Sequence, residues 1–129
     1  RAVAIGDCCL FHLDNAKPGM RVVQAFPVSR SADFGSTPFL VGSKAAAGGP
    51  PAAHRKLAEG SLRPDDFLLF ASDALAAWLL WRAEDERPAW RWVTAEVADK
   101  PAFENLVTQA RADGWRNDDV TLVRVRFRG

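Results

Sequence analysis

Two acidic positions stand where an apolar stretch of this sequence meets a polar one. Asp73 follows the apolar run 67–71, and Asp118 with Asp119 precedes the apolar run 120–125. A carboxylate at the end of a strand lies at the rim of a sheet, where it can contact water, a cation or a substrate. Two such carboxylates, if the fold brings them together, would suit a hard divalent metal ion such as Mg²⁺ or Mn²⁺.

Each of these positions also has a simpler explanation. Asp73 or Ser72 can cap the first turn of a helix, and Asp118 with Asp119 can form a polar turn before a strand. Asp7 follows a glycine, where turn chemistry explains an aspartate equally well. Taken singly, each simple explanation is the commoner case. Taken together, three acidic turns at strand ends point toward a metal site.

Other reactive side chains carry less information. His12 lies within an apolar run and is expected to be structural, and His54 is expected to be exposed. Cys8 and Cys9 are adjacent, so they cannot form an unstrained disulfide, and we interpret them as small residues on opposite faces of a strand. The chain has no His/Cys spacing for zinc, no glycine-rich phosphate loop and no nucleophile elbow.

The charge pattern excludes several classes of protein. The net charge is +1, so a general polyanion binder is not expected. Arg124, Arg126 and Arg128 alternate along a strand-like segment, which is typical of a solvated face, and nucleic-acid binding has no other support. No apolar stretch approaches the roughly 20 residues needed to cross a bilayer, so no membrane partner is expected.

Length and composition indicate one domain. The chain has 129 residues, of which 48% are hydrophobic and 26% charged, as in an ordinary folded protein. Residues 1–5 already resemble a strand, without a leading Met, so we expect that the sequence starts inside a larger domain. Free thiols and the absence of a recognisable signal peptide favour the cytoplasm.

The N-terminal half has the pattern of antiparallel strands. Residues 2–5, 8–13 and 20–26 are apolar, with a dense turn signal at 14–19, and together they predict a β-meander. Residues 29–63 have no clear period, and the Ala/Gly/Pro-rich stretch 45–51 is typical of a surface loop.

The C-terminal half changes from strand to helix and back. A turn at 63–66 leads into a buried strand at 67–71, and helical spacing from Ser72 ends before Pro88. A second helix is predicted over 100–112, with Asp99 as its N-cap. The closing strand, 120–127, alternates apolar residues with arginines. Without regular βαβ alternation, this order predicts an α+β fold with an antiparallel sheet.

The order and spacing of three short motifs resemble the C-terminal half of a metal-dependent protein phosphatase of the PP2C (PPM) family, in particular bacterial PP2C-like proteins. That family has a Gly-Asp-Ser motif, then a Ser-Asp-Gly motif after an apolar strand, and finally Asp-Asn before a Thr-containing last strand. The resemblance covers nearly the whole chain. The matching stretches are Gly6-Asp7-Cys8, Ser72-Asp73-Ala74-Leu75 and Asn117-Asp118-Asp119-Val120-Thr121.

The resemblance implies both a fold and a reaction. The fold would be the C-terminal part of a four-layer α-β-β-α sandwich with antiparallel sheets. Two Mn²⁺ or Mg²⁺ ions would activate a water that attacks a phosphoserine or phosphothreonine of a phosphoprotein substrate. Asp73 and Asp118 would be metal ligands. Asp119 takes the place of the family's Asn and is a further candidate ligand, and Asp7 would be structural.

The sequence also departs from the family pattern. Cys8 replaces the Ser, Ala74 replaces the Gly, and the family's earlier acidic, Arg and His motifs are absent. The chain is therefore interpreted as residues 1–129 of a single phosphatase domain whose N-terminal half is its required partner, and alone it would be inactive. A non-catalytic PP2C-like binding or regulatory domain is the first alternative. An unrelated structural or interaction domain is the second.

Overall fold

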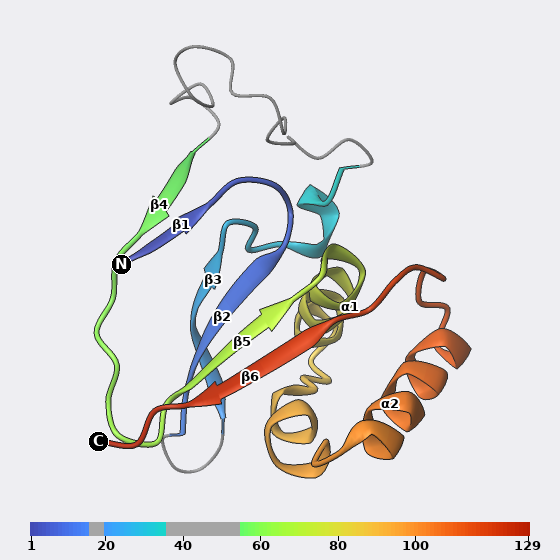
Figure 1. Cartoon of the computed structure of the whole chain (residues 1–129). Helices are drawn as coiled ribbons and strands as arrows, with labels where there is room; N and C mark the ends of the chain where they lie inside the picture. Colours follow the sequence, from blue (N-terminus) through green and yellow to red (C-terminus); the bar gives the residue numbers. More distant parts are fainter. Residues whose placement is uncertain (16–19, 36–54) are drawn as a thin grey trace, which may run out of the picture.

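The computed structural model describes residues 1–15, 20–35 and 55–129. Its main element is a four-stranded antiparallel sheet in the order β3-β2-β5-β6 (Figure 1). The strands are β2 (Cys9–Asp14), β3 (Arg21–Phe26), β5 (Phe67–Ala71) and β6 (Leu122–Arg126). The predicted turn at 14–19 falls largely, and His54 and the stretch 45–51 wholly, outside the described residues.

A separate two-stranded ribbon pairs β1 (Ala2–Ala4) with β4 (Lys56–Ala58). The predicted β-meander over 2–27 is therefore wrong in its first strand, although the hairpin of β2 and β3 is confirmed. The partner of β1 comes from about 50 residues further along the chain, beyond the reach of a local pattern. With two antiparallel sheets and several helices, the fold class is α+β.

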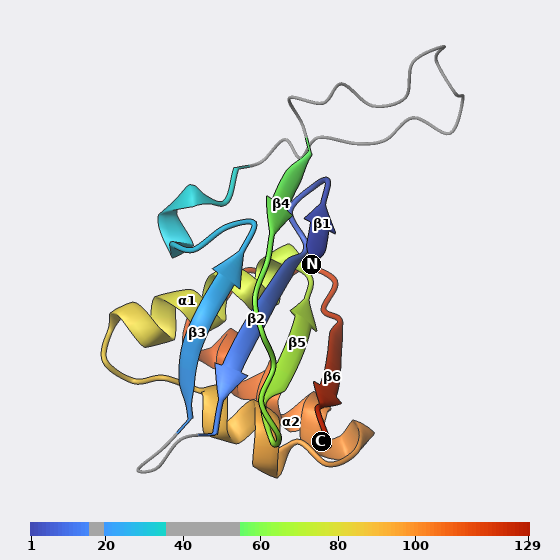
Figure 2. The same cartoon turned by 90° about the vertical axis from the view of Figure 1, so that its left-hand side faces the viewer.

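The helices all cover one face of the four-stranded sheet, and Figure 2 looks onto the opposite face with the helices behind it. They are α1 (Asp73–Glu84), the π-helical segment η3 (Trp92–Glu96) and α2 (Lys100–Ala112). The expected helix 100–112 is confirmed, and Asp99 Oδ1 accepts a hydrogen bond from Ala102 N at 2.9 Å, as an N-cap should. A short 3₁₀ turn, η1 (Ser31–Asp33), packs against α1.

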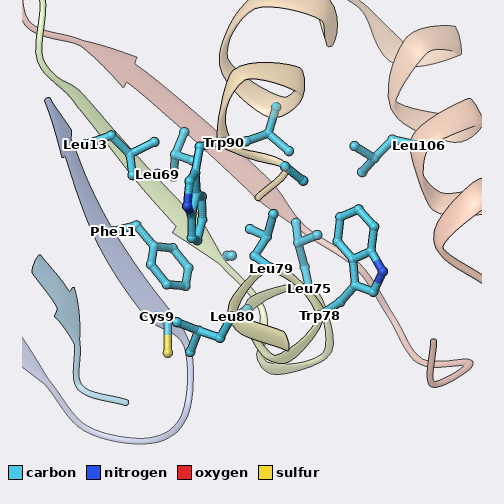
Figure 3. Packing of buried hydrophobic residues seen from close by; sticks show 14 of the residues in the cluster. Cys9, Phe11, Leu13, Leu69, Leu75, Trp78, Leu79, Leu80, Trp90 and Leu106 are labelled. Atoms are coloured by element: carbon cyan, nitrogen blue, oxygen red, sulfur yellow. The ribbon is translucent and has the colours of Figure 1, made fainter. Parts of the chain in front are cut away.

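The core fills the space between this sheet face and the helices (Figure 3). Alternate residues of β2 and β5 point inward, because successive side chains of a strand point to opposite faces. Leu75 and Leu79 meet them from α1, and Leu106 from α2. Phe11 contacts Trp90 with ring centroids 5.1 Å apart. The fully buried large side chains are Phe11, Leu13, Leu69, Leu75, Leu79, Leu106 and Val93.

The other face of the sheet is only partly covered. In Figure 2 the chain that follows β4 crosses in front of the sheet on its way to β5. Phe70 remains 44% exposed, and its cross-strand partner Val123 remains 50% exposed. Val125 and Phe127 on the same side of β6 are also exposed. The apolar side chains of the last strand therefore lie on the face of the sheet that the helices leave open.

The arginines of β6 lie on the side of the sheet that carries the helices, and Arg124 and Arg126 are both exposed, as expected of a solvated arginine face. Arg124 pairs in register with the buried Leu69, so its side chain reaches the helical layer. Its Nη1 donates to the carbonyl oxygens of Val93, Thr94 and Val97, at 3.2, 2.8 and 2.8 Å. Arg126 instead pairs with Asp65 at 2.6 Å.

Candidate functional site

The candidate site lies at one end of the four-stranded sheet. Because β2 and β5 are antiparallel, Cys9 faces Ala71, so the start of β2 adjoins the end of β5. Because β5 and β6 are antiparallel, Ala71 faces Leu122, so the end of β5 adjoins the start of β6. The register therefore places the strand ends that border Asp7, Asp73 and the Asp118–Asp119 segment at the same end of the sheet.

Ser72 fastens two of these segments together. Its backbone N donates to Thr121 O at 3.1 Å, and its Oγ accepts from Thr121 N at 3.1 Å and donates to Asp119 O at 3.3 Å. Ser72 is the N-cap residue of α1, but its side chain makes no capping hydrogen bond. Ser72 therefore occupies the expected cap position without capping the helix, because its hydroxyl bonds the segment at the start of β6 instead.

Asp73 begins α1 and is half-buried. It lies close enough to Cys8 to act on that thiol electrostatically. The pKa of Cys8 is raised by partial burial first, then by the negative charges of Asp7 and Asp73. The Gly-Asp turn before β2 and the first residue of α1 therefore both lie near the Cys8 thiol. The two segments are more than 60 residues apart in the sequence.

Asp118 is held in place by local contacts. Its Oδ1 accepts a hydrogen bond from Asp119 N at 2.8 Å, and its Oδ2 lies 3.4 Å from Arg116 Nη2. The side chain remains 40% exposed, so this ion pair is screened by solvent and does not lock the carboxylate. Asp118 and Asp119 also line a hollow of about 370 Å³ beside α2.

Carboxylates are the right type of ligand for a hard divalent cation, but the candidate site has too few of them. Carboxylate oxygens are the ligands that Mg²⁺ and Mn²⁺ prefer. Within residues 1–15, 20–35 and 55–129, however, no group of three or more His, Cys, Asp or Glu side chains is placed to hold a metal ion. Any such site needs ligands in addition to Asp73 and Asp118.

A buried acid–base pair lies elsewhere in the molecule and was missed from the sequence. His12 Nε2 is 2.7 Å from Asp66 Oδ2, and Asp66, in the predicted turn at 63–66, is only 4% exposed. Asp66 Oδ2 also accepts from Arg63 N at 2.8 Å. The one available signal was a histidine inside an apolar strand, because a buried polar group needs a partner. The pair joins β2 to the turn before β5.

The two cysteines behave as expected from their order in the strand. Cys8 is exposed, Cys9 is buried, and both are free thiols. Burial of Cys9 raises the pKa of its thiol to about 11, which leaves it protonated and inert at neutral pH.

Comparison of the chain with protein-family models, curated proteins and solved structures finds no match. Among the helices within the described ranges, none has the length and apolar character needed to cross a membrane.

Proposed function

We propose that this chain is the C-terminal portion of a metal-dependent serine/threonine phosphoprotein phosphatase of the PP2C type, acting in the cytoplasm. The observation that carries the proposal is the antiparallel register of β2, β5 and β6. It supports a shared rim because it puts Asp7, Asp73 and the Asp118–Asp119 segment at one end of the sheet. The Ser72 hydrogen bonds reinforce that arrangement.

In this proposal Asp73 and Asp118 supply carboxylates to the metal centre, and Asp119 is a further candidate. The N-terminal half of the same domain supplies the remaining ligands, because two aspartates cannot complete the coordination of two ions. When bound, two Mn²⁺ or Mg²⁺ ions lower the pKa of a water molecule and neutralise the charge that develops on the phosphoryl group. The open apolar face of the sheet agrees with a second sheet packing there, as in a four-layer sandwich.

The residues of this chain would act by position. Ser72 keeps the Asp118–Asp119 segment against the end of β5, and the α1 helix fixes Asp73 at its first turn. The exposed pair with Arg116 is weak enough for Asp118 to exchange it for a cation.

The alternative is a non-catalytic PP2C-like binding or regulatory domain. The contacts of Asp118 with Arg116 and Asp119 N favour it, because they satisfy this carboxylate without a metal. Ala74 in place of the family's Gly points the same way.

The test is phosphatase activity of the full-length protein with Mn²⁺ on a phosphothreonine peptide. We expect Asp73→Asn and Asp118→Asn each to lower kcat/KM by at least about 100-fold. Asp33→Asn, at the exposed η1 turn near the other end of α1, should leave activity unchanged. Equal activity in all three variants would refute the phosphatase assignment. Calorimetry with Mn²⁺ separates the alternatives, because a non-catalytic domain should bind little metal.

A further inference from the structure

Strand β6 forms one edge of the four-stranded sheet. Among the residues that the structure describes, it pairs with β5 on one side and with no strand on the other. Figure 2 shows this free side, where β6 is the last strand of the sheet. Residues 123–126 are all exposed. An edge strand of this kind offers its backbone to another strand.

The free side of β6 carries a row of backbone N–H and C=O groups. Phe127 N donates to Asp66 O in the turn before β5, and Thr121 O accepts from Ser72 N at the end of β5. Backbone groups of successive residues point to opposite sides of a strand, so the odd-numbered residues bond β5. The even-numbered residues therefore point to the free side, and their backbone groups have no partner within the described part of the chain. They are Leu122, Arg124 and Arg126.

The opposite edge of the sheet is protected, whereas β6 is not. A bulge interrupts the pairing of β3 with β2 between His12 and Leu13, and Pro27 directly follows β3. Bulges and prolines are devices that keep edge strands from pairing with other chains. In contrast, β6 keeps a regular register with β5 over all of its residues. The edge formed by β6 is therefore the one that can accept a further strand.

The charges on β6 indicate which kind of strand would fit. Arg126 is paired with Asp65, with 2.6 Å between Nη2 and Oδ1. Arg124 donates to carbonyl oxygens only, and in the described ranges no carboxylate forms an ion pair with it. The strand thus keeps an exposed positive charge at its centre. A carboxylate directly opposite Arg124 on an added strand would be stabilising.

A second copy of β6 fits this edge poorly. Residues directly opposite each other in an antiparallel pair lie on the same face of the sheet. Two copies of β6 related by a twofold axis would therefore place their arginines side by side on one face. Like charges in such positions destabilise the pair.

We propose that β6 binds an extended segment of a partner protein, which adds to the sheet as an antiparallel fifth strand. Its acidic residues would face Arg124 on the side of the sheet that carries the helices. Its β-branched apolar residues would lie beside Val123 and Val125, which are 50% and 45% exposed, and would cover part of their surface. The proposal is independent of the phosphatase assignment, because it involves neither Asp73 nor Asp118.

The test titrates the ¹⁵N-labelled chain with a capped heptapeptide of alternating valine and glutamate, and follows it by NMR and amide hydrogen exchange. We expect saturable binding that slows exchange at least about tenfold at Leu122, Arg124 and Arg126. Exchange at Val123 and Val125 should change little, because their N–H groups already face β5. The same peptide with lysine in place of glutamate should bind about five- to tenfold more weakly.

Two matched comparisons test whether the backbone makes the contact. N-methylation of the glutamate residues, whose N–H groups would donate to β6, should abolish binding, whereas N-methylation of the valines should not. Arg126→Pro removes one N–H group from the free side, whereas Arg126→Val removes the same side chain and keeps that N–H group. We expect Arg126→Pro to bind the peptide about tenfold more weakly than Arg126→Val. The methylated peptides need no variant, so they decide the question even if Arg126→Pro does not fold.

Three results would overturn the proposal. The first is the absence of saturable binding at millimolar peptide. The second is equal binding of the two methylated peptides, or binding without slower exchange at the even-numbered residues of β6. The third is slow exchange at these residues before peptide is added, which would assign the edge to a second copy or, in a longer form of the protein, to its own N-terminal half.

Discussion

At the scale of single residues, Cys8 reports on the charge of the candidate site. Partial burial and the carboxylates of Asp7 and Asp73 raise the pKa of its thiol, so the thiolate fraction at a given pH is smaller than for a free cysteine. Removing a negative charge, or adding a positive one nearby, must act in the opposite direction. Cys9 does not interfere, because it is buried and its pKa is about 11.

We therefore predict that Asp73→Asn increases the reaction rate of Cys8 with a thiol reagent at pH 8 by about two- to fivefold, as expected for a modest lowering of its pKa. Mn²⁺ or Mg²⁺ should accelerate the same reaction in the wild-type protein if the cation binds beside Asp73. The measurement is the pH–rate profile of a Cys9→Ala protein, with Asp33→Asn as control. An unchanged profile in Asp73→Asn would place the carboxylate too far from Cys8 to matter.

At the scale of elements, the Arg124 side chain links β6 to the helical layer. Arg124 donates to three carbonyl oxygens around η3, at the point where this helical turn ends. The last carbonyls of a helix have no partner within the helix, so a guanidinium there satisfies several acceptors at once. A side chain of the last strand, β6, thus caps the end of η3, a helical segment about 30 residues earlier in the sequence.

We predict that Arg124→Met lowers the free energy of unfolding by about 1–2 kcal/mol, because the stem remains while the carbonyls lose a charged donor. Arg128→Met, at the exposed end of the chain, should change it by less than about 0.5 kcal/mol. Urea denaturation followed by tryptophan fluorescence measures both. Equal stabilities of the two variants would mean that water replaces the guanidinium without loss.

At the scale of the whole molecule, the sheet has one covered face and one open face. The helices bury the side that carries Phe11 and Leu69, whereas Phe70 and Val123 stay about half exposed on the opposite side. Val125 and Phe127 extend that patch along β6. A contiguous apolar patch on a sheet is typical of a surface that another protein segment covers. Under the proposed function, that segment is the N-terminal half of the domain.

We predict that the double substitution Val123→Thr and Val125→Thr reduces self-association of the isolated chain and its binding of a hydrophobic dye. Threonine keeps the β-branched shape, so strand formation should persist while the exposed apolar area falls. Sedimentation velocity and dye fluorescence measure the two effects, and Val3→Thr on the ribbon is the matched control. Association that persists in the double variant would assign it to another surface.

Several elements could be predicted from the sequence because their signals are local. Helix 100–112 was predicted because Asp99, Pro101 and the apolar stripe ending at Ala110 lie within one segment. The strand at 67–71 was predicted from an unbroken apolar run between turn residues. The acidic positions at strand ends were visible for the same reason, since each borders its own strand. The resemblance to the phosphatase family rests on these local motifs and stays a prediction.

Features that depend on pairing between distant segments could be established only from the three-dimensional structure. It assigned β4 as the partner of β1, placed Asp66 against His12, and turned Arg124 toward the helices. An alternating strand specifies two faces but not which one the helices cover, because that depends on the register with β5. The same register brings residues 73 and 118 to one end of the sheet, since antiparallel neighbours join the end of one strand to the start of the next.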